Sequence, residues 1–96
     1  MAREVVWTEP AWQDLAAAVD YIARDSDIYA ATFVQEVQYA ADSLSQFAER
    51  GHVVSEFGDA TIRELLVRPY RLVYEVLDEK VLILALVHGA RRIGRV

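Results

Sequence analysis

The fold is decided by three neighbouring segments in the last third of the chain: IRELLV at residues 62–67, YRLVYEVL at residues 70–77 and VLILALV at residues 81–87. Each segment is rich in β-branched, aromatic and aliphatic side chains, which favours extended strands. The polar connection at residues 78–80 is short enough to close a hairpin between the last two segments. We therefore expect three consecutive strands that run into the basic sequence at residues 88–92.

The segment 70–77 alternates with the period of two that is typical of a strand. One face carries Tyr70, Leu72, Tyr74 and Val76, and the other face carries Arg71, Val73, Glu75 and Leu77. The segment 81–87 is apolar throughout, which predicts a central strand that is covered on both faces. We expect one side of the sheet to be apolar and the other mixed, and the mixed side is where chemistry is expected.

Two amphipathic helices are expected between a short first strand at residues 4–7 and the three later strands. Thr8 can cap the first helix, and its first turn tolerates proline. The polar residues 25–27 end that helix and can cap the second one. The second helix has an apolar stripe that consists of Phe33, Val37, Ala40, Leu44 and Phe47. A basic residue followed by glycine at Arg50-Gly51 predicts its end, with Gly51 in the left-handed conformation.

The expected order of elements is β-α-α-β-β-β. A helical hairpin packed on one face of a small, largely antiparallel four-stranded sheet is an α+β fold. Ninety-six residues with a 54% hydrophobic fraction are enough for one compact core. Residues 1–96 are therefore expected to form a single domain, with the second face of the sheet left open.

Several classes of protein are disfavoured by composition. The chain contains no cysteine and two histidines, His52 and His88, which favours neither a disulfide framework nor a metal site. Its longest wholly apolar run has seven residues, whereas a membrane-spanning helix needs roughly 20. The N-terminal residues lack the pattern of an export signal. We expect a cytoplasmic protein that needs no metal or other cofactor and does not bind a membrane.

Charge is distributed unevenly along the chain. The net charge is -5, and residues 1–50 contain nine acids and three bases, whereas residues 51–96 contain six acids and seven bases. Residues 88–96 contain three arginines, Arg91, Arg92 and Arg95, and no acid. This pattern favours a local contact with an anionic partner, because coating of duplex DNA needs many distributed cations.

The chain resembles the RelE/ParE superfamily of bacterial type II toxin–antitoxin systems, whose members are often labelled plasmid stabilization proteins. The resemblance is carried by Arg63-Glu64-Leu65, by Tyr70-Arg71-Leu72-Val73-Tyr74 and by His88-Gly89-Ala90-Arg91, in this order and spacing. It extends over essentially the whole chain. It implies a toxin that is neutralised by binding a cognate antitoxin.

Members of this superfamily have two kinds of activity. RelE-like members cleave messenger RNA on the ribosome, and ParE-like members poison DNA gyrase. Cleavage would need a base, an acid and cations for the phosphate, for which the candidates are Glu64, His88, Arg71 and Arg91. The cleaving branch typically carries lysines where this chain has Ile62 and Glu64, and a tyrosine beyond the position of Arg91, where this chain has none. The ParE-like branch, which is not an enzyme by itself, is therefore favoured.

The residues expected to contact the target share a basic or titratable side chain near the open sheet face. They are Arg63, Arg71, His88, Arg91 and Arg92. Each has an alternative reading. Arg63 and Arg71 could be paired with Glu64, Glu75 or an acid of a neighbouring strand. His88 could be a structural residue at a strand end, and the C-terminal arginines could be solvated.

The resemblance implies a separate antitoxin whose flexible segment wraps the toxin and covers apolar side chains. Phe33, Phe47 and Phe57, around the second helix and the loop after it, are the candidates for this contact. Without the antitoxin, the same surface could join two copies of the chain in a homodimer. A third possibility is an inactive family member that only binds the antitoxin.

Overall fold

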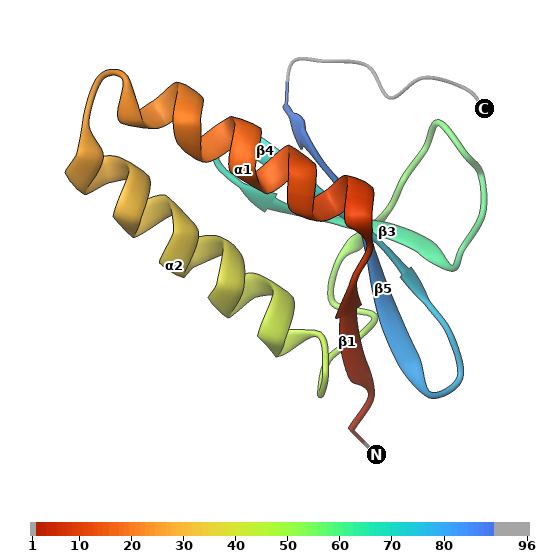
Figure 1. The fold of residues 1–96 in the computed structure, drawn as a ribbon. Helices are drawn as coiled ribbons and strands as arrows, with labels where there is room; N and C mark the ends of the chain where they lie inside the picture. The colour runs from red at the N-terminus through yellow and green to blue at the C-terminus, as the bar shows by residue number, and fades with distance from the viewer. Residues whose placement is uncertain (1, 90–96) are drawn as a thin grey trace.

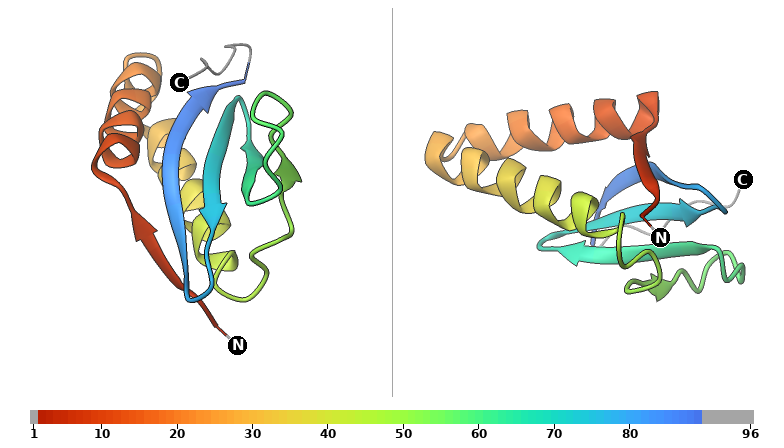
Figure 2. Two further views of the ribbon diagram at one scale, coloured as in Figure 1. Left: turned by 90° about the vertical axis from the view of Figure 1, so that its right-hand side faces the viewer. Right: turned by 90° about the horizontal axis from the view of Figure 1, so that it is seen from below.

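The computed structural model describes residues 2–89 and has two layers. Its elements are, in order, β1 (Glu4–Trp7), α1 (Glu9–Ala23), α2 (Asp27–Ser43), β2 (His52–Val53), β3 (Ile62–Val67), β4 (Tyr70–Val76) and β5 (Lys80–His88). The two helices form a hairpin that lies on one side of the sheet (Figure 1, Figure 2). This arrangement confirms the predicted α+β fold with a helical hairpin on one sheet face.

Within residues 2–89 the sheet has five strands in the order β1-β5-β4-β3-β2. β1 runs parallel to β5, and all other neighbours are antiparallel. The expectation of four strands was wrong, because His52 and Val53 pair with Glu64 and Arg63 at the edge of the sheet. A strand of two residues is too short to show alternation, so the sequence pattern does not reveal it.

α1 begins where the sequence predicts. The Thr8 hydroxyl oxygen accepts a hydrogen bond from the Ala11 N–H at 3.4 Å, which is the N-cap interaction, and Pro10 lies in the first turn. The Thr8 hydroxyl also donates to the carbonyl oxygen of Ile83 at 2.8 Å. One side chain therefore both starts the helix and fixes it to β5.

α2 begins as predicted but ends earlier. The Ser26 hydroxyl accepts a hydrogen bond from the Tyr29 N–H at 3.0 Å, as expected for an N-cap. The helix stops at Ser43, whereas the sequence predicted an end at Arg50-Gly51. Short turns follow it, in which the Arg50 guanidinium donates to the Ser43 hydroxyl at 2.7 Å. Of the two residues of the predicted apolar stripe that follow Ser43, Leu44 is buried and Phe47 is exposed.

The expected left-handed conformation of Gly51 was also wrong. Among the described glycines, the positive φ of 63° belongs to Gly58. Gly51 is needed for space, since a Cβ there would lie 2.5 Å from the Tyr74 hydroxyl and 2.5 Å from the Glu64 carbonyl oxygen. The Gly51 N–H donates to the Tyr74 hydroxyl at 2.9 Å. The glycine thus lets the chain approach β4 closely.

β5 contains a β-bulge that reverses its alternation. Tyr74 pairs with Ile83 and Val73 pairs with Ala85, so Leu84 is an extra residue in the ladder. The Leu86 N–H donates to the Asp14 carboxylate of α1 at 3.0 Å. β5 buries Val81, Ile83 and Leu86 on the helix side, while its other face is only half-buried. The expectation that this strand is covered on both faces was therefore wrong.

The core lies between the helical hairpin and the sheet. α1 contributes Leu15 and α2 contributes Phe33, which pack against a layer that includes Leu72, Tyr74 and Ile83. Phe33 and Tyr70 lie 5.2 Å apart between ring centroids. The alternation in β4 confirms which face is apolar, because Tyr70, Leu72 and Tyr74 all belong to this core.

Candidate functional site

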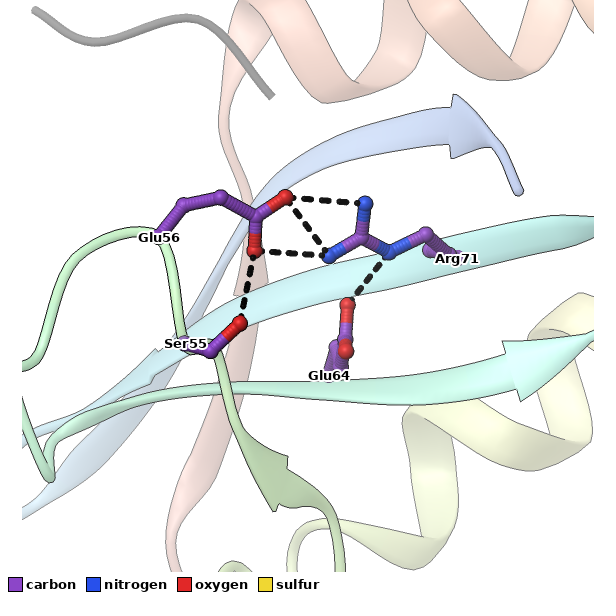
Figure 3. Close-up of polar contacts among 4 residues, drawn as sticks. All are labelled: Ser55, Glu56, Glu64 and Arg71. Atoms are coloured by element: carbon purple, nitrogen blue, oxygen red, sulfur yellow. Dashed lines mark hydrogen bonds and ion pairs between the residues drawn. The ribbon is translucent and has the colours of Figure 1, made fainter. Parts of the chain in front are cut away.

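The face of the sheet away from the helices, called the open face below, carries an ion cluster centred on Arg71. It is less open than the sequence predicted, since Val73 on this face is only 3% exposed. The Arg71 Nε donates to a carboxylate oxygen of Glu64 on β3 at 2.5 Å, and its terminal nitrogens contact both carboxylate oxygens of Glu56 at 3.3 Å (Figure 3). Glu56 belongs to the loop between β2 and β3 and also accepts a hydrogen bond from the Ser55 hydroxyl at 3.4 Å. The Arg71 side chain is 11% exposed. One guanidinium thus ties the loop to two strands.

The electrostatics of this cluster favour the charged guanidinium. The hydrogen bond to Glu64 raises the pKa of Arg71 most, and Glu56 adds to the rise, while burial acts in the opposite direction. Both carboxylates are occupied by the same cation. The cluster is therefore a structural clamp in this state, and the ion-pair reading of Arg71 is confirmed with Glu64 and, in addition, Glu56.

His88 lies on the other face of the sheet. It pairs with Tyr70, and the two rings meet edge to face at 5.5 Å between centroids. Arg71 pairs with Val87 and points to the open face, because adjacent strand residues point to opposite sides. Glu64 and His88, the candidate base and acid, are consequently separated by the sheet.

The bulge explains why sequence alternation misplaces His88. Counted from Val81 without interruption, His88 would fall on the face opposite to Val81, which is the open face of Arg71. The extra residue Leu84 moves all later side chains of β5 to the other face. Sequence carries no clear signal for this shift, since all seven residues at 81–87 are apolar.

Arg63 lies away from both groups. Its guanidinium is on the helix side of β3 and donates to the carbonyl oxygens of Gly51 at 2.9 Å and Glu49 at 3.3 Å. The expected pairing with Glu64 or Glu75 was wrong for this arginine, because both acids lie on the opposite face. Arg63, Arg71 and His88 thus do not form one surface.

Comparison with known proteins addresses the family. The family model of the ParE toxin of type II toxin–antitoxin systems, parDE, matches residues 5–93. This chain belongs to the ParE toxin family. It is 42% identical over 89 residues to a protein named Toxin RelE2 from Caulobacter vibrioides, covering 92% of this chain and 97% of that protein.

The fold of this ParE-family toxin is also found in a solved structure. A chain of the chromosomal ParDE toxin–antitoxin system from P. aeruginosa matches with a TM-score of 0.73 and 26% identity. The match covers 91% of this chain and 96% of that chain. The protein is therefore a toxin of a type II toxin–antitoxin system, and its family implies a cognate antitoxin as partner.

The three phenylalanines expected to meet the antitoxin lie in different environments. Phe33 is 0% exposed and packs in the core, so its direct role in binding was wrongly predicted. Phe33 belongs to the apolar stripe of α2, and the sequence does not distinguish an apolar residue of the core from one that binds a partner. Phe47 is 66% exposed and Phe57 is 37% exposed, and both remain available for contact.

Other exposed apolar side chains of the toxin were missed in the sequence. They are Trp12, Tyr21, Ile28, Tyr29, Tyr39, Val53 and Leu66. The sequence does contain a signal that the helix residues Tyr21 and Tyr39 are exposed, because both fall outside the apolar stripes of the helices. Tyr39 is 77% exposed on α2, whereas Tyr21 is 63% exposed and lines a cavity with Tyr70 and His88 of the sheet. A partner could cover either side chain.

Arg91 and Arg92 lie outside the described residues 2–89. Within those residues there is no group of three or more acidic, histidine or cysteine side chains arranged to hold a metal ion. No helix there is both long and apolar enough to cross a lipid bilayer.

Proposed function

We propose that this toxin inhibits DNA gyrase by binding it and does not cleave RNA by itself. The supporting observation is the separation of the two candidate proton-transfer groups, Glu64 and His88, by the sheet. Cleavage through the 2′-hydroxyl requires a base and an acid on the two sides of one phosphate. Among residues 2–89, the open face offers Glu64 and Arg71 already bound to each other.

The rival function is cleavage of messenger RNA on the ribosome. It is favoured by one observation, which is the printed name RelE2 of the Caulobacter vibrioides relative. In that case Arg71 and Arg91 would hold the phosphate, and the cluster with Glu56 and Glu64 would have to open. The fixed geometry of the cluster opposes this, because a guanidinium engaged by two carboxylates has little capacity left for phosphate.

Neutralisation is proposed to occur by direct binding of an antitoxin. Phe47 and Phe57, together with the exposed Tyr21 and Tyr39, offer apolar surface that an extended segment could cover. The same surface would support a homodimer in isolation. The toxin would meet its proposed target, gyrase, in the cytoplasm.

The test is induction of the chain without any antitoxin, followed by assays with purified protein. We expect DNA damage and filamentation in cells, and loss of supercoiling by purified gyrase, with intact mRNA on ribosomes. If the protein cleaves ribosome-bound mRNA and a folded His88→Ala variant does not, the rival function is supported and gyrase inhibition is not. Growth at the rate of uninduced cells would identify an inactive member.

A matched pair of variants tests the basic end of β5. Arg91→Ala is expected to abolish toxicity in either active function, because Arg91 is the cationic residue of the His88-Gly89-Ala90-Arg91 motif that carries the family resemblance. Arg24→Ala, at the exposed end of α1, is the control and should remain toxic. A folded Arg91→Ala protein as toxic as the parent would remove Arg91 from the target-binding residues.

A further inference from the structure

Three arginines converge at the end of the molecule where β1 begins. The turns after α2, the start of β1 and the β4–β5 turn meet there (Figure 1). One cavity of about 270 Å³ is lined by Arg3, Arg63, Glu49 and Asp78 among others, and a second of about 380 Å³ by Arg3, Arg50, Glu49 and Phe47 among others. The two cavities share Arg3 and Glu49, so they adjoin.

Each of these guanidiniums is held by neutral acceptors. Arg63 donates to the carbonyl oxygens of Gly51 and Glu49, Arg3 donates through Nε to the carbonyl oxygen of Leu77 at 2.8 Å, and Arg50 donates to the Ser43 hydroxyl. In the described part of the chain, the ion pairs are those of Arg71. Arg3, Arg50 and Arg63 therefore form no ion pair with a carboxylate of the described residues.

The geometry leaves donors directed at a ligand. Arg3 and Arg63 are half-buried. A guanidinium has five N–H donors, and each of these two arginines uses only one of its three nitrogens in the contacts with carbonyl oxygens. The carbonyl contacts fix the side chains without cancelling their charge. A partly desolvated cation that is already positioned gains more from an anion than a flexible solvated one does.

We propose that Arg3, Arg50 and Arg63 form a binding site for a carboxylate of an acidic peptide segment supplied by a protein partner. Glu49 and Asp78 flank the arginines, so the local charge is only about +1 by the count of these five side chains. A polyanion such as nucleic acid would be repelled by these acids and by the net charge of -5. A single carboxylate meets the arginines without this penalty.

A peptide is favoured over a free anion by the apolar residue beside the site. Phe47 lines the second cavity and is 66% exposed. It offers a contact for an apolar side chain next to the acid. The site lies at the opposite end of β4 from Tyr70 and His88, since Arg63 pairs with Tyr74. The proposal therefore does not depend on which cellular target the toxin poisons.

The test is an NMR titration of the full-length, ¹⁵N-labelled protein at constant ionic strength. The probes are the blocked tetrapeptide Leu-Asp-Glu-Leu, its uncharged counterpart Leu-Asn-Gln-Leu, and inorganic phosphate. We expect saturable shifts of the Nε–H signals of Arg3 and Arg63 and of the Gly51 amide with the acidic peptide alone. Shifts of equal size with the uncharged peptide, or the absence of saturable shifts, would overturn the proposal.

Substitutions locate the binding. Arg63→Gln should weaken binding of the acidic peptide by about tenfold or more, because a charge-assisted pair is lost. If Arg63→Gln does not fold, Arg50→Gln is the second variant, since Arg50 is exposed and its removal leaves the core intact. Arg24→Gln is the control and should bind as the parent does. Tighter binding of phosphate than of the acidic peptide would overturn the carboxylate assignment.

Discussion

At the scale of single residues, the partners of each strand arginine depend on the sheet face on which its side chain lies. Arg71 and Arg63 both lie inside strands, and each is partly buried. Arg71 faces the open side, where Glu64 and Glu56 approach it, whereas Arg63 faces the helix side and meets backbone carbonyl groups. The same residue type is therefore an ion-pair centre in one strand and an unneutralised cation in the next.

Arg71→Ala is expected to lower the free energy of unfolding by about 2 kcal/mol, because two half-buried carboxylates lose their shared cation. Urea unfolding measures the change. Arg68→Ala is the matched control, since Arg68 is exposed in the turn before β4, and it should stay within about 0.5 kcal/mol of the parent. Equal losses in the two variants would show that the cluster contributes no stability.

Asp59 gives a residue-scale test by titration. Hydrogen bonds from the Thr61 N–H, first, and the Thr61 hydroxyl, second, lower the pKa of Asp59 from its ordinary value of 3.8. The charged form is favoured in the fold, so this stabilisation is present above about pH 3.8 and is lost as pH falls through the lower folded pKa. Stability falls with falling pH because the Asp59 carboxylate takes up its proton at a higher pH in the unfolded state than in the folded state.

Thr61→Val removes only the hydroxyl donor, so we expect the Asp59 pKa to rise while remaining below 3.8. A ¹³C NMR titration of the Asp59 carboxyl group measures it. In Thr32→Val, which alters an exposed threonine on α2, the Asp59 pKa should not move. A Thr61→Val protein with an unchanged Asp59 pKa would contradict the assigned cause.

At the scale of elements, α1 and β5 are joined by two side-chain contacts on either side of the bulge. The Thr8 hydroxyl donates to the Ile83 carbonyl oxygen, and the Asp14 carboxylate accepts from the Leu86 N–H. These contacts satisfy backbone groups beside Leu84, where the β4–β5 ladder is irregular. The bulge is therefore supported by the helix that packs over it.

Thr8→Ala is expected to cost about 2 kcal/mol, because it removes both the cap of α1 and the hydroxyl's hydrogen bond to the Ile83 carbonyl oxygen, while the Thr8 N–H bond to the same oxygen remains. Ser26→Ala is the matched comparison and should cost about 1 kcal/mol, since Ser26 caps α2 without a second partner among the described residues. Chemical denaturation of both variants measures the difference. A larger loss in Ser26→Ala would show that the Thr8–Ile83 bond adds nothing.

At the scale of the whole molecule, Tyr74 connects the core to the segment after α2. Its ring is fully buried, and its hydroxyl accepts from the Gly51 N–H. Burial raises the pKa of Tyr74 above its ordinary value of 10.0, and the Gly51 hydrogen bond opposes this. The folded state keeps the proton longer than the unfolded state, so stability falls as pH rises above about 10.

Tyr74→Phe is expected to cost about 1–3 kcal/mol at neutral pH, because the buried Gly51 N–H loses its acceptor. It should also reduce the fall in stability as pH rises above about 10, measured by urea unfolding at each pH. Tyr39→Phe, with a side chain that is 77% exposed, is the control and should match the parent. An unchanged slope in Tyr74→Phe would assign the alkaline loss to other groups, such as Tyr70.

The sequence by itself determined the features that depend on neighbours along the chain. Thr8 and Ser26 indicate where the helices begin, because an N-cap side chain bonds a backbone N–H only three residues further along the chain. The alternation at residues 70–76 identifies the apolar face of β4 because strand side chains point to alternate sides. The joint order of the motifs was enough to indicate the RelE/ParE superfamily, which the match to the ParE family confirms.

Only the tertiary structure decided how distant residues meet. The one-residue bulge at Leu84 turned His88 away from Arg71, and an apolar run gives no sign of such a shift. The loop residue Glu56 became a partner of Arg71, and Arg3 came beside Arg63, across long stretches of chain. The physical reason is that local patterns set periodicity, whereas strand register and packing set which faces and which distant charges come together.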